Sequence, residues 1–168
     1  DAVNNVVFCN GETTPEITFS TPLVTGTTTY EWTIDTNIGL APLADTGAIP
    51  SFIAVNTTNE PIIATVTVEP IFSNATDPTV ECDGVQQVFT ITINPSPQIT
   101  NTLDSQTICS EDSSTAVEWT SSIVNGTPTE YNWTFVSATA GITGHVTDPN
   151  VGDLPVFPLL SNSSKGCI

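Results

Sequence analysis

The same aromatic phrase occurs twice in this chain, about one hundred residues apart. "TTTYEWTID" at residues 27–35 returns as "PTEYNWTFV" at residues 128–136. In both copies apolar side chains stand at every second position, and the side chains of a β-strand alternate between its two faces. Each phrase therefore predicts a strand whose aromatic face packs on a core. The recurrence predicts two copies of one module.

Further residues recur at the same separation. Each copy begins at a cysteine and then carries an aromatic residue, a glycine and the aromatic phrase in the same order. A period of about one hundred residues is the size of an immunoglobulin-like (Ig-like) β-sandwich. The aligned pairs are Cys9 with Cys109, Phe19 with Trp119, Val24 with Val124 and Gly26 with Gly126, followed one residue out of step by Tyr30 and Trp32 with Tyr131 and Trp133.

Strand signals dominate the whole chain, and no segment has the pattern of a helix. Short runs rich in Val, Ile and Thr alternate in polarity and are separated by Gly, Pro, Asn and Asp. Each run predicts a strand with one face on a core and the other toward water. The sequence therefore predicts an all-β fold of two tandem Ig-like sandwich modules. The expected core-facing residues are Ile62, Ala64, Val66 and Val68 in one run, Phe89, Ile91 and Ile93 in a second, and Tyr30, Trp32, Tyr131 and Trp133 in the two aromatic phrases.

The boundary between the modules is expected in the segment "NPSPQITNTLD" at residues 94–104. Pro95 and Pro97 cannot donate hydrogen bonds to a β-ladder, so strand pairing should stop there and a short linker begin. We place the first module at residues 1–96 and the second at residues 97–168.

The second module looks shorter than the first. After "LPVF" (residues 154–157), which resembles "IPSF" (residues 49–52), the first module predicts two more strands, but the sequence closes with "KGCI". A sandwich without its last strands would expose an open edge. Three explanations are open: the sequence is cut from a longer array, a segment is missing, or a strand from a neighbouring chain fills the gap.

The charge balance excludes several kinds of partner. The chain has 18 acidic residues and one base, Lys165, so its formal net charge is -17. Binding to phosphate backbones or to anionic lipid surfaces requires several Lys or Arg residues, which excludes nucleic acid and anionic membranes. No apolar run approaches the ~20 residues of a membrane-spanning helix, so we expect a soluble chain without membrane insertion.

No group of residues points to catalysis. A nucleophilic Ser, Cys or Thr needs a base within reach, and His145 is the only histidine of the chain. Adjacent acids such as Glu111 and Asp112 are more typical of solvated turns than of a glycosidase pair. Tyr30 and Trp32 could stack on sugar rings, but strand alternation points them into the core. We therefore expect a protein that is not an enzyme.

Two acidic loops are candidate calcium sites. "TDPTVECDG" (residues 76–84) and "TDPNVGD" (residues 147–153) combine acids with turn residues, and calcium takes roughly six to eight oxygen ligands. Neither loop has the spacing of an EF-hand, and Asx-type turns are the competing explanation. As a hypothesis, calcium bound there would stiffen the link between modules. The candidate ligands are Asp77, Glu81, Asp83, Asp148, Asn150 and Asp153.

The four cysteines favour disulfides over a zinc site, because they lack the close Cys and His spacing of structural zinc. Disulfides persist in oxidising compartments, which predicts a location outside the cytoplasm. We expect Cys9 to pair with Cys82, since both lie in the first module and flank its strands. Cys109 would pair with Cys167, although these two are closer in sequence than the first pair.

Five Asn-x-Ser/Thr triplets would be N-glycosylation acceptors in a eukaryotic secreted protein. The chain is rich in threonine and serine, so such triplets also arise by chance. They begin at Asn56, Asn74, Asn125, Asn132 and Asn162.

The order of these pieces resembles a known family of repeats. The modules start with "VFCNGE" or "ICSED" and continue with "GTTTYEWT" or "GTPTEYNWT", and the first goes on with "ATVTVEP" and "CDGVQQVFTITINPSP". This order resembles the PKD-like (polycystic-kidney-disease-like) repeats of very large cell-surface proteins of the Bacteroidota. Those proteins include gliding-motility adhesins exported by the type IX secretion system. The resemblance covers the whole chain.

The resemblance implies a secreted chain of tandem modules at the bacterial cell surface, which acts as a stalk, filament or adhesive segment without catalysis. Its partners would be neighbouring repeats of the same chain or identical subunits, with surface glycans as a further candidate. By the same resemblance, Cys9 and Cys82 would form the intramodule bridge. Two other functions are open: a carbohydrate- or calcium-binding accessory module of a secreted enzyme, and a fibre subunit assembled by strand complementation.

Overall fold

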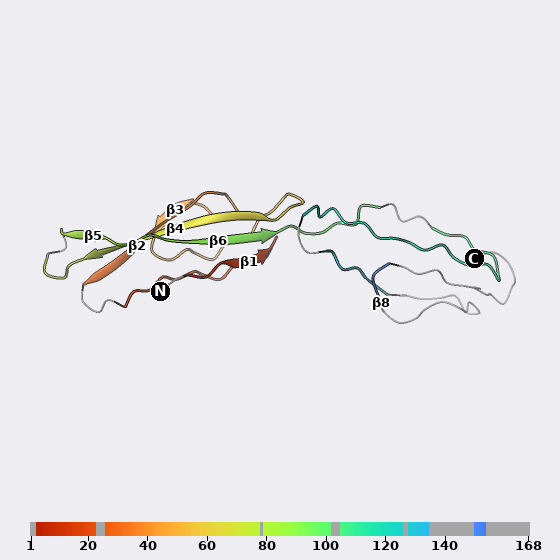
Figure 1. Ribbon diagram of the computed structural model, residues 1–168, viewed down its shortest axis with the longest axis horizontal. Coiled ribbons are helices and arrows are strands. Elements are labelled where there is room, and N and C mark those ends of the chain that lie inside the picture. Colours follow the sequence, from red (N-terminus) through yellow and green to blue (C-terminus); the bar gives the residue numbers. More distant parts are fainter. Residues whose placement is uncertain are drawn as a thin grey trace. The chain divides into compact units, whose positions relative to one another are not determined.

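The structure is a computed structural model that describes residues 3–22, 26–77, 79–101, 105–125, 128–134 and 150–153 (Figure 1). The chain divides into two compact units, Asp1–Ser96 (unit 1) and Pro97–Ile168 (unit 2). The described residues contain β-strands and no helix, so the predicted all-β class is confirmed. The finer assignment of each unit as an Ig-like sandwich stays a prediction.

Unit 1 contains one mixed sheet of six strands. The strand order is β1-β6-β4-β2-β3, and β5 pairs with the end of β4. The β1·β6 pair is parallel and the other pairs are antiparallel. Unit 2 has a two-stranded sheet, β7·β8, among its described residues. The strands are β1 (Val6–Cys9), β2 (Thr27–Ile34), β3 (Ala44–Thr46), β4 (Ile62–Ser73), β5 (Glu81–Asp83), β6 (Gln87–Asn94), β7 (Asn132–Trp133) and β8 (Asn150–Val151).

Strand β4 lies at the centre of the sheet and buries one face along its length. Ala64, Val66 and Val68 are at most 3% exposed, whereas the side chain of Ile63, directly before them on the opposite face, is 60% exposed. The period-two alternation of the sequence therefore decides which face meets the core. Opposite residues on neighbouring strands share this face and form continuous apolar rows. The rows are Trp32–Val68, Ile34–Val66–Phe89, Ala64–Ile91–Val6 and Ile62–Ile93–Phe8.

A second layer covers this face. Residues 11–17 and 49–54 run antiparallel to each other and are joined by backbone hydrogen bonds; we call them the covering ribbon. The Thr14 N–H donates to the Phe52 carbonyl oxygen (2.9 Å), and the Ile17 N–H donates to that of Ile49 (2.9 Å). The buried Ile49, Phe52 and Ala54 belong to the same apolar cluster as the rows of the sheet. The core thus lies between a regular sheet and an irregular ribbon.

Unit 2 repeats several backbone features of unit 1. The Gly47 N–H donates to the Tyr30 carbonyl oxygen, and the Gly152 N–H donates to that of Tyr131, both at 2.8 Å. In each unit this bond continues a strand pair that includes the tryptophan of the aromatic phrase, β2·β3 in unit 1 and β7·β8 in unit 2. The recurring phrase of the sequence therefore corresponds to a recurring strand pair.

The turn after the first cysteine also recurs. The Glu12 N–H donates to the Cys9 carbonyl oxygen (3.0 Å), and the Asp112 N–H donates to that of Cys109 (3.1 Å). Both turns contain a residue in the left-handed region, Gly11 with φ 85° and Glu111 with φ 75°. A residue with a side chain is unfavourable in that region by roughly 1–2 kcal/mol. The turn of unit 2 nevertheless keeps this conformation without a glycine.

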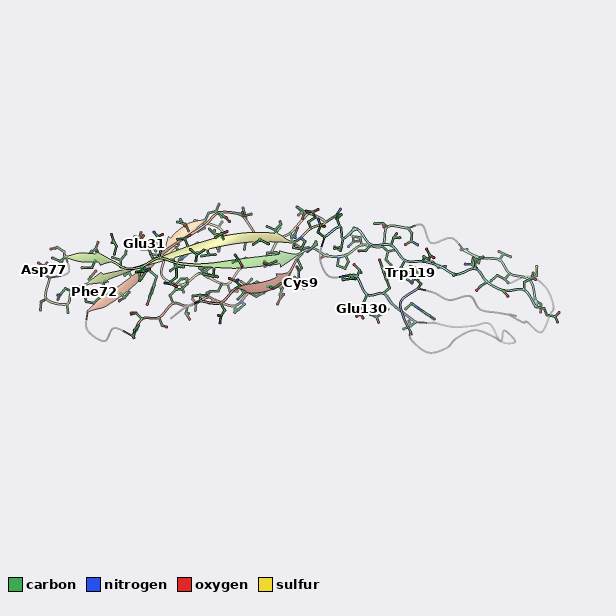
Figure 2. All side chains as sticks on the ribbon, in the orientation of Figure 1. Cys9, Glu31, Phe72, Asp77, Trp119 and Glu130 are labelled. Atoms are coloured by element: carbon green, nitrogen blue, oxygen red, sulfur yellow. The ribbon has the colours of Figure 1, made fainter. Side chains whose placement is uncertain are left out.

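The predicted Cys9–Cys82 disulfide is wrong, because both residues are free, exposed thiols. Cys9 lies opposite Asn94, where β6 pairs with the start of β4, whereas Cys82 lies opposite Phe72 near the far end of β4. About ten residues of β4 separate the two positions, or roughly 33 Å at about 3.3 Å per residue. A disulfide requires Cα atoms about 4.4–6.8 Å apart. Figure 2 shows Cys9 and Phe72 far apart along the sheet.

The position of Trp32 generates a stability prediction. Its side chain is 1% exposed, so Trp32→Ala should lower the free energy of unfolding of unit 1 by about 3–5 kcal/mol, as large-to-small core changes do. The Trp32 indole N–H is buried and has no hydrogen-bond partner among the described residues. Trp32→Phe, which keeps an aromatic ring and loses no such bond, should therefore be clearly less destabilising. Chemical denaturation of both variants measures the difference, and a loss below about 1 kcal/mol for Trp32→Ala would contradict the core assignment.

Candidate functional site

Each unit contains two of the four aromatic residues predicted for the core, one tyrosine and one tryptophan. Trp32 is fully buried, and Tyr30 is half-buried with its ring 5.5 Å from that of Phe19. In unit 2, Tyr131 and Trp133 are half-buried, and the Tyr131 ring is 6.4 Å from the Trp119 ring. Each unit thus pairs the tyrosine of its aromatic phrase with the aromatic residue that follows its first cysteine.

A small pocket lies beside each aromatic pair, and the sequence did not predict either one. The pocket in unit 1 has a volume of about 230 Å³ and is lined by Phe19, Tyr30 and Val68 among others. The pocket in unit 2 has a volume of about 250 Å³ and is lined by Trp119 and Tyr131 among others. Sites for small-molecule ligands usually enclose about 300–1,000 Å³. These pockets are therefore too small to favour a sugar-binding platform.

The first acidic loop forms a turn. The Asp77 carboxylate accepts hydrogen bonds from the Thr79 hydroxyl (2.6 Å) and the Thr79 N–H (3.2 Å). These two bonds lower the pKa of Asp77 below its ordinary value, the hydroxyl being the larger cause. Glu81 and Asp83 lie on β5 and are exposed. The Asx-type turn that competed with calcium as an explanation is thus present at Asp77.

The second acidic loop is described only in part. Asn150 lies in β8, and the Asp153 carboxylate accepts a hydrogen bond from the Trp119 N–H (2.9 Å). Asp148 lies outside the described residues. Within the part of the chain that the structure describes, no three His, Cys, Asp or Glu side chains come close enough to hold a metal ion.

The cysteines of unit 2 remain a prediction. Cys109 lies at the start of the recurring turn and is not one of the free thiols. Cys167, its predicted partner, lies outside the described residues, as do His145 and Lys165.

Asn56 is a structural residue that the sequence reasoning missed. Its side chain is 3% exposed, and its Nδ2 donates to the carbonyl oxygens of Glu60 (2.8 Å) and Ile93 (2.7 Å). Its Oδ1 accepts from the Thr58 N–H (2.9 Å) and hydroxyl (2.8 Å). The amide nitrogen that a glycan would occupy is therefore buried and engaged, so this triplet is not an acceptor in the folded chain.

The same Asx-x-Thr turn occurs three times among the described residues of unit 1. Asn74 accepts from the N–H (2.9 Å) and hydroxyl (2.7 Å) of Thr76, as Asn56 does from Thr58 and Asp77 from Thr79. An acceptor oxygen two residues before a threonine satisfies both polar groups locally. Turn chemistry therefore accounts for two of the five Asn-x-Ser/Thr triplets. The signal in the sequence was the shared spacing of the Asn-x-Thr and Asp-x-Thr triplets.

Comparisons of the chain with protein-family models, with curated proteins and with solved structures find no match. No helix among the described residues is long and apolar enough to cross a membrane.

The Asn56 network generates a matched pair of variants. Asn56→Ala should lower the free energy of unfolding by roughly 2–4 kcal/mol, because it removes four hydrogen bonds made by a buried side chain. Asn74→Ala removes the same kind of turn at an exposed position and should change the free energy of unfolding by less than about 1 kcal/mol. Denaturant unfolding of both variants measures the contrast, and equal losses would show that Asn56 is not a buried anchor.

Asp35 generates a pH prediction. Its carboxylate accepts a hydrogen bond from the Thr65 N–H (2.8 Å), which is the main cause that lowers its pKa below the ordinary value of 3.8. A lowered folded pKa stabilises the fold above the unfolded value, and that stabilisation is lost as the pH falls through the folded pKa. Wild-type stability should therefore fall more steeply than that of Asp35→Asn as the pH is lowered below about 4. Parallel slopes in denaturant titrations across this range would refute the contribution of Asp35.

Proposed function

We propose that this chain is a non-catalytic structural segment of a bacterial cell-surface stalk or filament, built from tandem modules and held outside the cell. The recurrence of the Tyr–Gly hydrogen bond and of the cysteine turn in both units supports a repeated module. A repeated module multiplies length without adding new chemistry, as in other tandem arrays. The resemblance to PKD-like repeats of gliding-type adhesins supports the same function.

The pairing of the first and last strands of unit 1 is the observation that carries the proposal. Strand β1 begins the unit, β6 ends it, and the two lie side by side in parallel over four residue pairs, from Val6 opposite Ile91 to Cys9 opposite Asn94 (Figure 1). Tension on the chain pulls β1 toward its N-terminal end and β6 toward its C-terminal end. The two strands must then slide past each other, so their hydrogen bonds are loaded together. This arrangement suits a segment that transmits force.

The outer face of the sheet supports a structural function as well. It presents threonines on neighbouring strands, such as Thr33 opposite Thr67 and Thr65 opposite Thr90. It also places Glu31 directly opposite Glu69, a like-charge pair that disfavours close contact with another acidic surface. With a net charge of -17, such a surface keeps neighbouring chains apart and soluble.

The other functions have less support. A carbohydrate-binding module would need a larger aromatic platform than the pockets beside Tyr30 and Tyr131 offer. A calcium-binding module would need several acids close together, and within the described residues no three His, Cys, Asp or Glu side chains are close enough to hold a metal ion. A fibre subunit completed by a neighbouring strand depends on residues 154–168, which lie outside the described part of the chain.

Force spectroscopy in two pulling directions tests the proposed function. Both chains carry Cys82→Ser and Ser96→Cys. The first chain also carries Cys9→Ser and is held at its N-terminus and at position 96. Pulling between these two points shears β1 against β6. The matched chain is held at Cys9 and at position 96, two points at the same end of the β1·β6 pair, which peels the strands apart one bond at a time. Forced unfolding is governed by the unfolding barrier, so the shear direction should require the clearly higher force.

The two possible results show whether the β1·β6 pair resists extension of the chain. A higher rupture force for the end-to-end direction supports a stalk segment. Equal rupture forces in both directions would contradict it, because β1·β6 would then not be the pair that resists extension. Both chains carry Ser96→Cys and Cys82→Ser, so any loss of stability from these changes affects them equally; the one difference between them, Cys9→Ser, is at an exposed position.

A further inference from the structure

Three aromatic residues line the pocket in unit 2. They are Trp119, Tyr131 and Trp133, and we call them the aromatic cage. The Trp119 and Tyr131 rings are stacked with their centroids 6.4 Å apart. Tyr131 and Trp133 are two residues apart in an extended segment, so their side chains share one face. All three side chains are half-buried, so part of each ring stays accessible.

The aromatic cage presents carbon surface to a ligand. The Nε1 atoms of Trp119 and Trp133 are buried and have no hydrogen-bond partner among the described residues, so the accessible part of each indole is carbon. Pro97 and Ile99 line the same pocket and add apolar surface. A ligand that must form several hydrogen bonds gains little from such walls. A cation without N–H groups is attracted by the negative face of the rings.

Backbone hydrogen bonds hold the apolar wall of the pocket in place. The Thr100 N–H donates to the Thr120 carbonyl oxygen (2.9 Å), and the Ser122 N–H donates to that of Gln98 (2.9 Å). Ile99 lies between these bonds in an antiparallel bridge. The wall therefore does not have to be ordered by the ligand, which lowers the cost of binding.

The charge around the aromatic cage is negative. Glu130 lines the same pocket as Trp119 (Figure 2), and the Asp153 carboxylate accepts a hydrogen bond from the Trp119 N–H (2.9 Å). The whole chain has one Lys or Arg residue against 18 acidic residues. The electrostatic field at the cage therefore favours a cation over an anion.

The matching pocket of unit 1 lacks these features. Phe19 stands where unit 2 has Trp119, and Thr29 stands where unit 2 has Glu130. The tryptophan of the first aromatic phrase, Trp32, is 1% exposed and is not among the described lining residues. None of those lining residues is acidic. The two units therefore differ at the positions that would recognise a cation.

We propose that the aromatic cage of unit 2 binds a quaternary ammonium group, such as the trimethylammonium group of choline. This group is a cation that donates no hydrogen bond, so it matches walls of carbon in a negative field. Pockets for drug-sized ligands enclose about 300–1,000 Å³, so a volume of about 250 Å³ suits a small headgroup. Binding at the cage would add a ligand to one module of the proposed stalk and does not depend on the stalk function.

Titration of the full chain with choline, followed by NMR, tests this inference. The chain has three tryptophans, whose indole N–H resonances report on the two units separately. The resonances of Trp119 and Trp133 should shift and saturate. The resonance of Trp32 in unit 1 should stay unchanged, which makes it an internal control.

A neutral analogue separates attraction by charge from apolar contact. In this analogue of choline a tert-butyl group replaces the trimethylammonium group, so the shape is kept and the charge is lost. It should bind roughly tenfold more weakly, because the cation–π attraction is absent. A peptide that carries trimethyllysine is titrated in parallel, and the tighter of the two trimethylammonium ligands shows whether the group comes from a small molecule or from a modified protein.

A matched pair of variants locates the site. Trp119→Phe gives unit 2 the residue that unit 1 has at the aligned position, and it should weaken choline binding by roughly twofold or more, because Trp is the strongest cation–π partner. Phe19→Leu changes the aligned position in unit 1 and should leave the affinity unchanged. Thermal unfolding checks that both variants are folded.

Three results would overturn the inference. The first is that the Trp119 and Trp133 resonances do not move, or move without saturating. The second is equal affinity for choline and its neutral analogue, which would make the site an apolar pocket only. The third is an equal effect of Trp119→Phe and Phe19→Leu on choline binding. The force experiment loads unit 1 alone, so the stalk proposal and this inference can fail independently.

Discussion

The antiparallel pairing of β4 with β2 on one side and β6 on the other is the interaction on which the rest of unit 1 depends. It aligns Ala64, Val66 and Val68 with the apolar residues of both neighbours, so that one face of the sheet becomes continuous and dry. Full burial of each valine contributes about 1.5–3 kcal/mol. The covering ribbon needs this face to pack on, and β1 needs β6 in place. The length of β4 also keeps the two free thiols of unit 1 at separate ends of the sheet.

Unit 2 shows which parts of this design are retained when the sequence changes. The aromatic pair, the Tyr–Gly backbone bond and the cysteine turn are all present, although a glycine is replaced by Glu111 and Phe19 by Trp119. The burial pattern of residues 11–20 is the same as that of residues 111–120. Backbone geometry is therefore retained more strictly than residue identity. Such retention is expected of the repeated structural module that we propose.

Local alternation was readable from the sequence, and long-range pairing was not. The period-two pattern predicted the buried faces around Trp32, Val66 and Ile91, because side-chain direction in a strand depends only on position. The parallel β1·β6 pair joins residues far apart in the chain, and no local pattern encodes its register. The error at Cys9 and Cys82 follows from this, since pairing was inferred from shared module membership without a distance. The buried role of Asn56 was not predicted, because its Asn-x-Thr triplet was interpreted as a possible glycosylation acceptor.

The central claim is that one local design is built twice in this chain. Residue-resolved amide exchange by NMR tests it most directly, because the Gly47 and Gly152 amides donate to matching tyrosine carbonyls, as the Glu12 and Asp112 amides do to matching cysteines. We expect both members of each pair to be protected from exchange relative to unstructured chain. Protection at Gly47 and Glu12 together with free exchange at Gly152 and Asp112 would contradict the claim.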